Sequence, residues 1–291
     1  MVFNDTRVIP ARLYGKRGDA KIEILLHKKY SDTSSWQCFA KPAKKLRAGD
    51  TVIFADDFLA VVTDKLASGE VVLQFEYSEN TLHEKLAAHG HMPLPPYIER
   101  ADNSQDREHY QTVYAKHDGS VAAPTAGLHF TNALLSAIDA MGVKRVHVTL
   151  HVGGGTFLPV KAEDTADHVM HSEYAAVTQE AADAINQAKE QGGRVIAVGT
   201  TSLRTLESAT DAMGKLHAFA DETSIFITPG YRFKLVDMLL TNFHLPRSTL
   251  FMLVCAFAGT DAMKNAYNHA IANHYRFYSY GDACLLYKSQ S

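Results

Sequence analysis

The sequence predicts two parts of different construction, a β-rich first third followed by an α/β remainder. Short apolar runs with tight turns occupy the first third, and residues 70–77 alternate side chains as a half-exposed strand does. After about Tyr110 the pattern changes to strands that alternate with helices. The 291 residues suffice for about two domains of roughly 150 residues each.

The first third is expected to form a small antiparallel barrel or sandwich of five short strands. Residues 65–69 predict a hairpin turn before the last of them. The prolines of residues 94–97 predict a stiff segment, and the polar residues 101–108 predict a linker. The five strands are expected at residues 8–13, 20–26, 51–54, 58–63 and 70–77.

The first two helices of the remainder each have a threonine as a candidate N-cap. Thr131 precedes a helix that is expected to end at Gly142, and Thr178 precedes one that ends at residues 192–193. Between them, residues 145–152 are expected to form a strand. The apolar face of the first helix is expected to consist of Leu134, Leu135, Ile138 and Met141.

A second strand and a third helix follow. Residues 195–198 form a short apolar run that predicts a buried strand. The third helix carries Leu203, Leu206 and Met213 and is expected to end at Gly214. Strands and helices in this order indicate a sheet covered by helices.

The overall charge excludes a globally basic nucleic-acid-binding protein. The chain has 29 basic and 32 acidic residues, which give a net charge of −3. Any contact with nucleic acid must therefore come from a local patch. One basic run, Lys41, Lys44, Lys45 and Arg47, fits either a solvated surface or a phosphate-contact patch.

The cysteines and the apolar runs bound the location of the protein. The three cysteines are far apart in the sequence, and no two of them form a C-x-x-C pair; they are Cys38, Cys255 and Cys284. This spacing argues against a disulfide framework and fits a protein of the reducing cytoplasm. No apolar run reaches about 18 residues, so no membrane span is expected.

The histidine spacings do not favour a metal site. His147 and His151 lie on one strand with Cα atoms about 13 Å apart, too far to share a metal ion. His168 and His171 could converge only on a helix, and no H-E-x-x-H pattern is present. We expect these histidines to be hydrogen-bonding polar residues.

Two glycine-containing segments that follow strands are candidate anion sites. The loop at residues 153–156 can point backbone N–H groups at an anion, although an ordinary tight turn would also explain it. Residues 199–202 place hydroxyls at a helix N-terminus, and Arg204 adds a cation. A plain threonine or serine cap explains the second segment about as well.

Three further polar segments each contain a histidine in or beside a predicted loop. Loops at the strand ends of an α/β sheet are the usual place for a site. The three segments are residues 124–130, 170–174 and 241–246.

Ten segments distributed from Val2 to about Leu286 together resemble one family. PTAGLHFT, HVGGGTFLPV and TNFHLPRSTL are long and highly specific. The others are NDTRVIPARL, KPAKKLRAGD, MPLPPYI, YQTVYA, MHSEY, VGTTSLRTLES and YRFYSYGDA. In order and content they resemble the S-adenosylmethionine:tRNA ribosyltransferase-isomerases of queuosine biosynthesis.

The resemblance implies an α/β domain with an inserted small β-barrel domain. The barrel domain would comprise residues 8–108, and the α/β catalytic domain residues 1–7 and 109–291. The implied partner is tRNA with a GUN anticodon (Asp, Asn, His or Tyr). The implied protein is a cytoplasmic monomer without a membrane contact.

The resemblance also implies the reaction. The ribosyl part of S-adenosylmethionine is transferred to 7-aminomethyl-7-deazaguanine at the wobble position and isomerised, which gives epoxyqueuosine and releases adenine and methionine. S-adenosylmethionine is a consumed substrate, and no metal or further cofactor is implied.

The chemistry needs acids, bases and an anion site. The sulfonium acidifies the adjacent ribose carbon, so a positioned histidine or glutamate can begin the rearrangement. The unranked acid–base candidates are His129, His151, His171, Glu173 and His244. The substrate-binding candidates are Asp5, Arg7, Thr125, Gly127, Gly153, Gly155, Thr156, Gly199, Thr200, Thr201, Arg204 and Asn242.

The front of the chain leaves alternatives open. Family members usually carry several dozen residues before the NDTRV segment, including an arginine-rich stretch. We therefore expect a missing upstream segment, an open strand edge at Val2 and Phe3, and poor catalysis. One alternative is a tRNA-binding form that has lost catalysis. Another is a metal-dependent hydrolase that uses His129, His151, His168 and His171.

Overall fold

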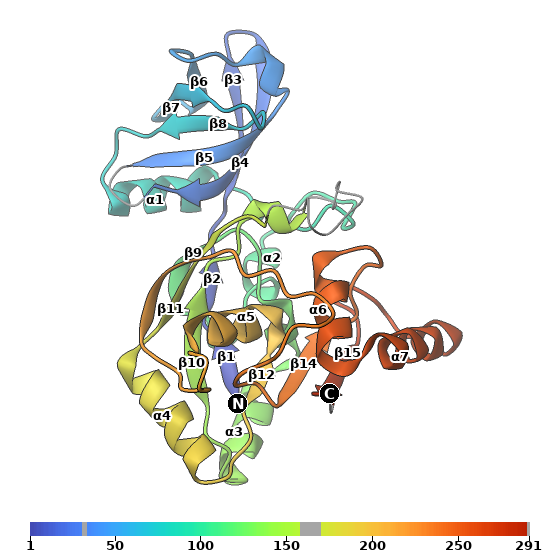
Figure 1. The fold of residues 1–291 in the computed structure, drawn as a ribbon. Coiled ribbons are helices and arrows are strands. Elements are labelled where there is room, and N and C mark those ends of the chain that lie inside the picture. The colour runs from blue at the N-terminus through green and yellow to red at the C-terminus, as the bar shows by residue number, and fades with distance from the viewer. Residues whose placement is uncertain (31–33, 158–169, 290–291) are drawn as a thin grey trace.

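The computed structural model describes residues 1–30, 34–157 and 170–289, and it contains a closed barrel above a layered α/β part (Figure 1). The barrel order is β3-β4-β5-β8-β7-β6, with each neighbouring pair antiparallel and β3 paired with β6. Its strands are β3 (Arg12–Arg17), β4 (Ala20–Lys29), β5 (Ser35–Lys41), β6 (Thr51–Ala55), β7 (Phe58–Lys65) and β8 (Val71–Gln74).

Apolar side chains that alternate along the strands fill the barrel. Ile22, Ile24 and Leu26 of β4 point inward, and the rings of Phe58 and Phe75 stack with centroids 5.7 Å apart. Helix α1 (Glu79–His89) packs its buried leucines against the same cluster. The barrel interior is therefore a packed core of its own.

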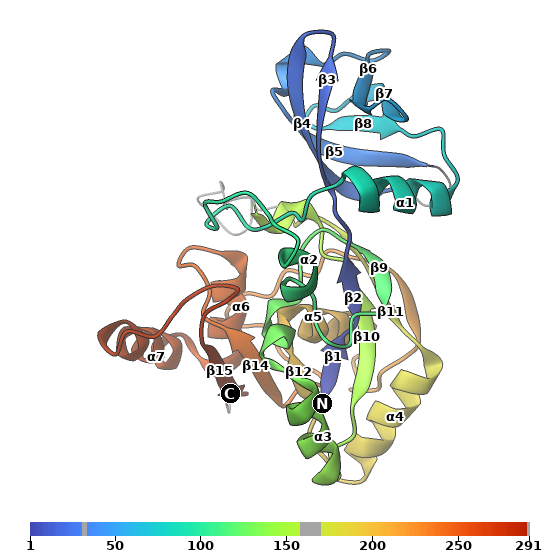
Figure 2. The same cartoon turned by 180° about the vertical axis from the view of Figure 1, so that it is seen from behind.

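The α/β part is built on a seven-stranded sheet with the order β13-β11-β10-β1-β12-β14-β15. Its four parallel strands are β10 (Val146–Leu150), β1 (Val2–Asn4), β12 (Ile196–Val198) and β14 (Met238–Asn242). The antiparallel outer strands are β11 (Glu173–Val177), β13 (Phe219–Thr223) and β15 (Ala283–Tyr287). The parallel strands all end at one edge, which faces the barrel (Figures 1 and 2).

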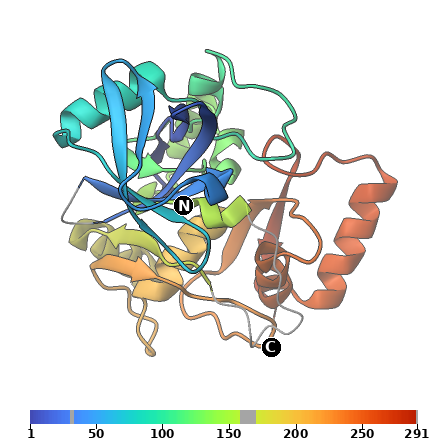
Figure 3. The ribbon, with the colours of Figure 1, turned by 90° about the horizontal axis from the view of Figure 1, so that it is seen from above.

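A short pair of strands connects this edge to the barrel. β2 (Thr6–Val8) continues directly from β1 and pairs in parallel with β9 (His117–Ser120). The three-residue gap from Val8 to Arg12 then leads into β3. Seen from above, the barrel overlaps the N-terminal end of the chain, whereas the last helix lies to one side (Figure 3).

Helices cover both faces of the sheet. Val2 of β1 belongs to a cluster with residues of α4 (Gln179–Glu190), α5 (Gly199–Ala209), α6 (Thr249–Ala258) and α7 (Thr260–Ala272). Phe3 points the other way, into a cluster with α3 (Asn132–Ala140). Short turns are α2 (Asp106–His109), η1 (Ala43–Lys45), η2 (Thr125–His129) and η3 (Gly154–Phe157).

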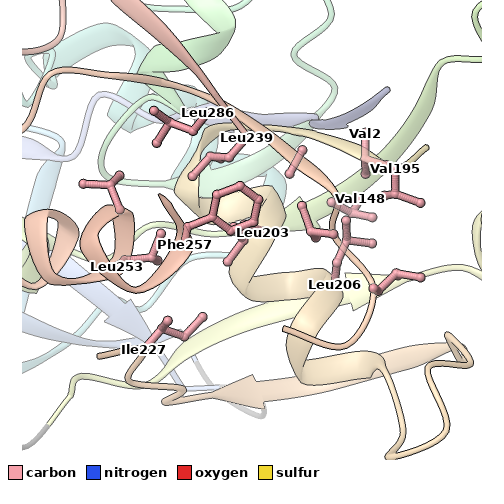
Figure 4. Close-up of a cluster of buried hydrophobic side chains, with 14 of the residues drawn as sticks. Val2, Val148, Val195, Leu203, Leu206, Ile227, Leu239, Leu253, Phe257 and Leu286 are labelled. Atoms are coloured by element: carbon pink, nitrogen blue, oxygen red, sulfur yellow. The ribbon is translucent and has the colours of Figure 1, made fainter. Parts of the chain in front are cut away.

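Helix α5 lies at the centre of the larger cluster. Leu203 and Leu206 point toward Val2, Val148 and Leu239 of the sheet (Figure 4). Nine of the eleven residues of α5 are buried, so its position is determined by packing along almost its whole surface.

The predicted fold class is confirmed, with differences in the strands of the barrel. The predicted strand at residues 8–13 is wrong, because the chain leaves β2 at Val8 and begins β3 only after Pro10. β5 was not among the expected strands, although its buried Trp36 and Cys38 alternate with Gln37 as strand residues do. The domain limits at residues 8 and 108 stay a prediction.

The N-termini and C-termini of the first two helices agree with the predictions, since Gly142 and Gly192 follow those helices with positive φ. The apolar face of the first helix and the end of the third helix do not. Thr131 and Thr178 accept N–H groups as predicted, but Leu134 and Met141 of the first helix are exposed. The third helix ends at Ala209, and Met213 is 94% exposed. The side chain of Asp211 accepts the N–H groups of residues 213 and 215, and this turn replaces the helix. The predicted linker at 101–108 contains α2.

The predicted open edge at the first strand is wrong. β1 pairs with β10 on one side and with β12 on the other, and Val2 and Phe3 are buried. In the described ranges, no helix has the length and apolar character needed to cross a membrane.

We predict that Glu207 is essential for stability. Its buried carboxylate accepts the hydroxyl of Tyr231 and the N–H groups of residues 234, 235 and 236 at 2.8–3.2 Å. Glu207→Ala leaves these buried donors unpaired, at about 1–3 kcal/mol each. We expect urea unfolding to show a loss of about 3 kcal/mol or more. The exposed Glu84→Ala is the control, and equal losses in the two variants would contradict the prediction.

Candidate active site

The edge at which β1, β10, β12 and β14 end carries three clusters of polar side chains. We call it the carboxyl edge. In open α/β sheets ligands bind at this edge, outside the ends of the parallel strands. Here the barrel lies over it (Figure 1), and His27 and Phe39 of the barrel lie against the glycine loop after β10.

The first cluster begins where β1 leaves the sheet. The Asn4 side chain accepts the N–H of Leu150 and donates to its carbonyl, both at 3.0 Å. It also accepts the N–H of Thr6 at 3.2 Å. This buried amide therefore holds β1 and β10 together at the point where the backbone ladder stops.

Asp5 and Arg7 follow with different surroundings. Asp5 is buried, accepts the hydroxyl of Thr149 at 2.7 Å, and lies 3.6 Å from His117. The Arg7 side chain is exposed and donates to the carbonyl of Ala115 at 2.8 Å. The structure therefore fixes Asp5 inside the edge and leaves Arg7 at the surface.

His151 is held beside these residues. Its Nδ1 lies 2.7 Å from the hydroxyl of Thr6, and its ring stacks on Tyr174 with centroids 5.9 Å apart. Burial lowers the pKa of His151 below its ordinary value. The ring is consequently neutral near pH 7, the form that can accept a proton.

The second cluster surrounds the glycine loop after β10. A Cβ atom on Gly153 would lie 3.0 Å from His27, and one on Gly154 would lie 3.0 Å from Phe39. A Cβ atom on Gly155 would lie 2.5 Å from the ring of His171. The groups that approach this loop are side chains of the barrel and of the segment before β11. The predicted anion site at the N–H groups of the loop stays a prediction.

Glu173 connects this loop to α5. One carboxylate oxygen accepts the N–H of Gly153 at 3.1 Å, and the other pairs with Nη1 of Arg204. Both side chains are buried. The charge of Arg204 is therefore balanced by that of Glu173. What Arg204 provides for a ligand is a set of N–H donors with fixed directions.

Buried polar atoms without a partner gather around this pair. They are Nε and Nη2 of Arg204, the hydroxyl of Thr201 and Nδ1 of His27. Unpartnered buried donors are rare in folded proteins, and each one needs an explanation. A ligand with acceptor oxygens would satisfy Arg204 and Thr201, which agrees with the predicted anion site without testing it.

His27 and Glu70 were missed by the sequence reasoning. Both are buried in the barrel, with Nε2 of His27 lying 3.7 Å from the carboxylate of Glu70. Burial lowers the pKa of His27, and Glu70 acts in the opposite direction. The sequence holds no signal for this pair, because only closure of the barrel brings the two residues together.

The third cluster lies at the end of β14. Asn242 donates its amide to the carbonyls of Tyr278 and Ser279, at 3.0 and 3.4 Å, and accepts the hydroxyl of Thr125. Carbonyls only accept, so the amide orientation is fixed. The same amide nitrogen lies 3.1 Å from Nε2 of His129. Nε2 is therefore the acceptor, and Nδ1 carries the hydrogen of the neutral ring.

The remaining candidates differ in their closeness to these clusters. His244 bonds Thr241 at 3.0 Å and donates its backbone N–H to Tyr267, and no hydrogen bond or ring contact joins it to another candidate in the described residues. Gly199 begins α5 with φ +86°, beside Ala126. Gly127 packs against Tyr114, Thr156 lies in η3, and Thr200 is buried in the first turn of α5. Residues 199–202 thus lie at the N-terminus of a helix, as predicted.

The described residues contain no group of three or more histidine, cysteine, aspartate or glutamate side chains that could hold a metal ion. His129 and His151 are bonded to Asn242 and Thr6, in separate clusters. His168, part of the metal-dependent hydrolase alternative, lies outside the described residues.

Comparison with known proteins gives consistent matches along the chain. Residues 1–286 match the family described as queuosine biosynthesis protein. An S-adenosylmethionine:tRNA ribosyltransferase-isomerase from Rhodospirillum rubrum is 59% identical over 98% of this chain and 83% of the relative. One from Parvibaculum lavamentivorans is 58% identical over 99% and 83%. A crystal structure of S-adenosylmethionine tRNA ribosyltransferase from Thermotoga maritima is 35% identical over 98% and 81%, with a TM-score of 0.49.

We predict that His244 makes stability fall in acid. Burial lowers the pKa of His244 to about 4, whereas an unfolded histidine titrates near about 6.5. The unfolded chain therefore binds a proton first, so this stability is present above pH 6.5 and is lost as the pH falls. Between pH 7 and pH 5 the unmodified protein should lose about 2 kcal/mol more than His244→Gln in urea unfolding. The exposed His269→Gln is the control, and identical pH profiles for all three proteins would refute this.

Proposed function

Because the chain belongs to the queuosine biosynthesis protein family, we propose that its carboxyl edge is the active site of an S-adenosylmethionine:tRNA ribosyltransferase-isomerase. The observation that supports this site is the set of unpartnered buried donors beside the Glu173–Arg204 pair. They lie where parallel strands end, which is where such a sheet binds a ligand.

The proposed substrates are S-adenosylmethionine and a tRNA with a GUN anticodon. The ribosyl group bonds to the amine of 7-aminomethyl-7-deazaguanine at the wobble position and rearranges to an epoxycyclopentanediol, while adenine and methionine leave. S-adenosylmethionine is consumed, so no further cofactor enters the scheme. The wobble base lies in a single-stranded loop, which presents it more cheaply than a duplex would. We also propose that the enzyme is located in the cytoplasm and acts as a monomer.

The three clusters suit three separate tasks. Neutral His151, buried beside Thr6, is the proposed base for the proton next to the sulfonium. His129 is the proposed donor to the departing adenine: its neutral ring offers the Nδ1 hydrogen as a hydrogen bond, and its imidazolium form supplies the proton that adenine takes. Arg204 and Thr201 offer unpaired donors for the methionine carboxylate.

Incubation with S-adenosylmethionine and precursor tRNA tests the activity. The poor catalysis expected from an open edge at Val2 and Phe3 does not follow, because β1 is paired on both sides. We therefore expect adenine release together with epoxyqueuosine in the digested nucleosides, detected by mass spectrometry. His151→Gln and His129→Gln should each lower turnover by about 10²- to 10⁴-fold while folding normally. His269→Gln is the control for the loss of an exposed histidine.

Two outcomes would contradict parts of this assignment. Full turnover in both histidine variants would remove His151 and His129 from the acid–base chemistry. Retention of tRNA without any adenine release would favour the alternative of a tRNA-binding protein that does not catalyse the reaction.

The donors at Arg204 can be tested without removing the charge that faces Glu173. Arg204→Lys keeps a cation there but loses the planar set of N–H groups. We expect the affinity for S-adenosylmethionine to fall by about 10- to 150-fold, the loss of one charge-assisted contact. Calorimetric titration measures this, and Thr201→Val should show a smaller loss. Unchanged affinity in both variants would make these residues structural.

A further inference from the structure

The barrel separates its charges along the chain. Residues 10–47 contain ten lysines and arginines against three acidic residues, whereas residues 48–77 contain one basic and six acidic residues. The first half, from β3 to η1, therefore has an excess of seven positive charges in a protein whose net charge is −3.

Six of those ten cations are not neutralised. Arg12, Arg17, Lys28 and Lys29 form ion pairs with Glu23, Asp50, Glu222 and Glu79, respectively. The other six are exposed, and in the part of the chain that the structure describes their charged groups have no carboxylate within 4 Å. They are Lys16, Lys21, Lys41, Lys44, Lys45 and Arg47.

Three of the six line one groove on the barrel, with a volume of about 770 Å³. Its basic residues are Lys16, Lys21 and Lys41. Its apolar walls include Tyr14 and Ile53, which are 53% and 50% exposed. The carboxylates in the groove are Glu23, which is paired with Arg12, and Asp56.

The strand register places like charges against each other in this groove. Lys16 of β3 lies directly opposite Lys21 of β4, and both side chains are exposed. Like charges in such a pair destabilise a sheet. A bound polyanion would remove this repulsion, so the pair indicates an anionic ligand more strongly than a scattered basic surface does.

Another contact holds the neighbouring basic turn in place. Lys65 of β7 donates to the carbonyls of Ala43 and Leu46, at 2.9 and 3.5 Å. These carbonyls bracket η1, which carries Lys44 and Lys45. The turn therefore presents its two lysines on a fixed backbone next to the groove.

We propose that this basic groove binds the phosphate backbone of the tRNA, with Tyr14 as a stacking surface, and the proposal rests on the function proposed above. β3 starts at Arg12, beside the α/β part, and extends about 20 Å toward the far end of the barrel (Figure 1). An RNA whose wobble base lies at the carboxyl edge can thus continue along the barrel. Lysines supply phosphate contacts, and an exposed aromatic ring supplies sequence-tolerant stacking.

The test replaces the three groove lysines together, as Lys16→Gln, Lys21→Gln and Lys41→Gln. The matched control, Lys144→Gln, Arg194→Gln and Lys215→Gln, removes the same charge from exposed positions outside the barrel. Fluorescence anisotropy with an unmodified tRNA transcript is recorded from 50 to 300 mM salt. We expect the groove variant to bind at least about tenfold more weakly at 0.1 M salt, with a salt slope lower by about 2 to 3. The control should bind like the unmodified protein.

Further readouts separate an RNA contact from damage to the fold. The groove variant should raise the KM for tRNA and leave kcat and the KM for S-adenosylmethionine unchanged. Its melting temperature should stay equal or rise, because the Lys16–Lys21 repulsion is gone. Tyr14→Ala should weaken binding about tenfold without changing the salt slope, since stacking releases no counterions.

The failures of the two proposals are distinguishable. Unchanged RNA affinity and salt slope in the groove variant would overturn the groove proposal even if the enzyme is fully active. A fall in kcat with an unchanged KM for tRNA would also overturn it. If the unmodified protein releases no adenine but the groove variant loses RNA affinity, the proposed function fails and the groove proposal stands.

Discussion

The carboxylate of Glu173 is the interaction on which the candidate site depends. It holds the glycine loop through Gly153, and it holds α5 through Arg204, from a position at the start of β11. Removing one partner of a buried ion pair leaves the other charge without compensation in the interior. The loop in turn presses against His27 and Phe39 of the barrel, so this carboxylate also sets how the barrel meets the sheet.

Unsatisfied polar groups concentrate at the same place. α5 is packed along nearly its whole surface, and this packing fixes the direction of the Arg204 and Thr201 side chains regardless of whether they find partners. Of the seven buried side-chain polar atoms without a partner in the described residues, four belong to Arg204, Thr201 and His27 around this edge, and three belong to Trp36, Glu70 and Thr112. Such local exceptions to general rules are expected at functional sites, where a ligand supplies the missing partner.

The sequence predicted the features that depend on nearby residues. The N-caps Thr131 and Thr178 bond N–H groups three positions on, so a short window contains the whole interaction. The burial of alternate residues in β10 has the same local origin. Of the candidate residues, Asp5 and Arg7 came from the family resemblance and the others mainly from glycine and polar segments at strand ends, and most of them lie along the carboxyl edge.

The features that escaped prediction depend on pairs distant in the chain. Nothing near His27 indicates Glu70, and nothing near Glu173 indicates that Arg204 will be its partner. The early end of α5 depends on the side chain of Asp211, which competes locally for N–H groups that a helix pattern assigns to the helix. In each case the hydrogen-bond or ion-pair partner is a side chain, where the sequence pattern suggests a backbone group or solvent. The periodicity of apolar residues carries no information about such side-chain partners.

The two parts of the molecule handle charge in opposite ways. At the carboxyl edge, Glu173 and Arg204 form a buried pair of opposite charges. Such a pair can orient a ligand through its hydrogen bonds, but because its charges cancel it does not attract RNA from a distance. The barrel instead exposes six cations on one half and keeps its acidic residues mainly on the other. If RNA is held at the barrel, its affinity and salt dependence are set away from the reacting atoms. The chemistry at the edge is then left to groups such as His151, whose neutral ring can accept a proton.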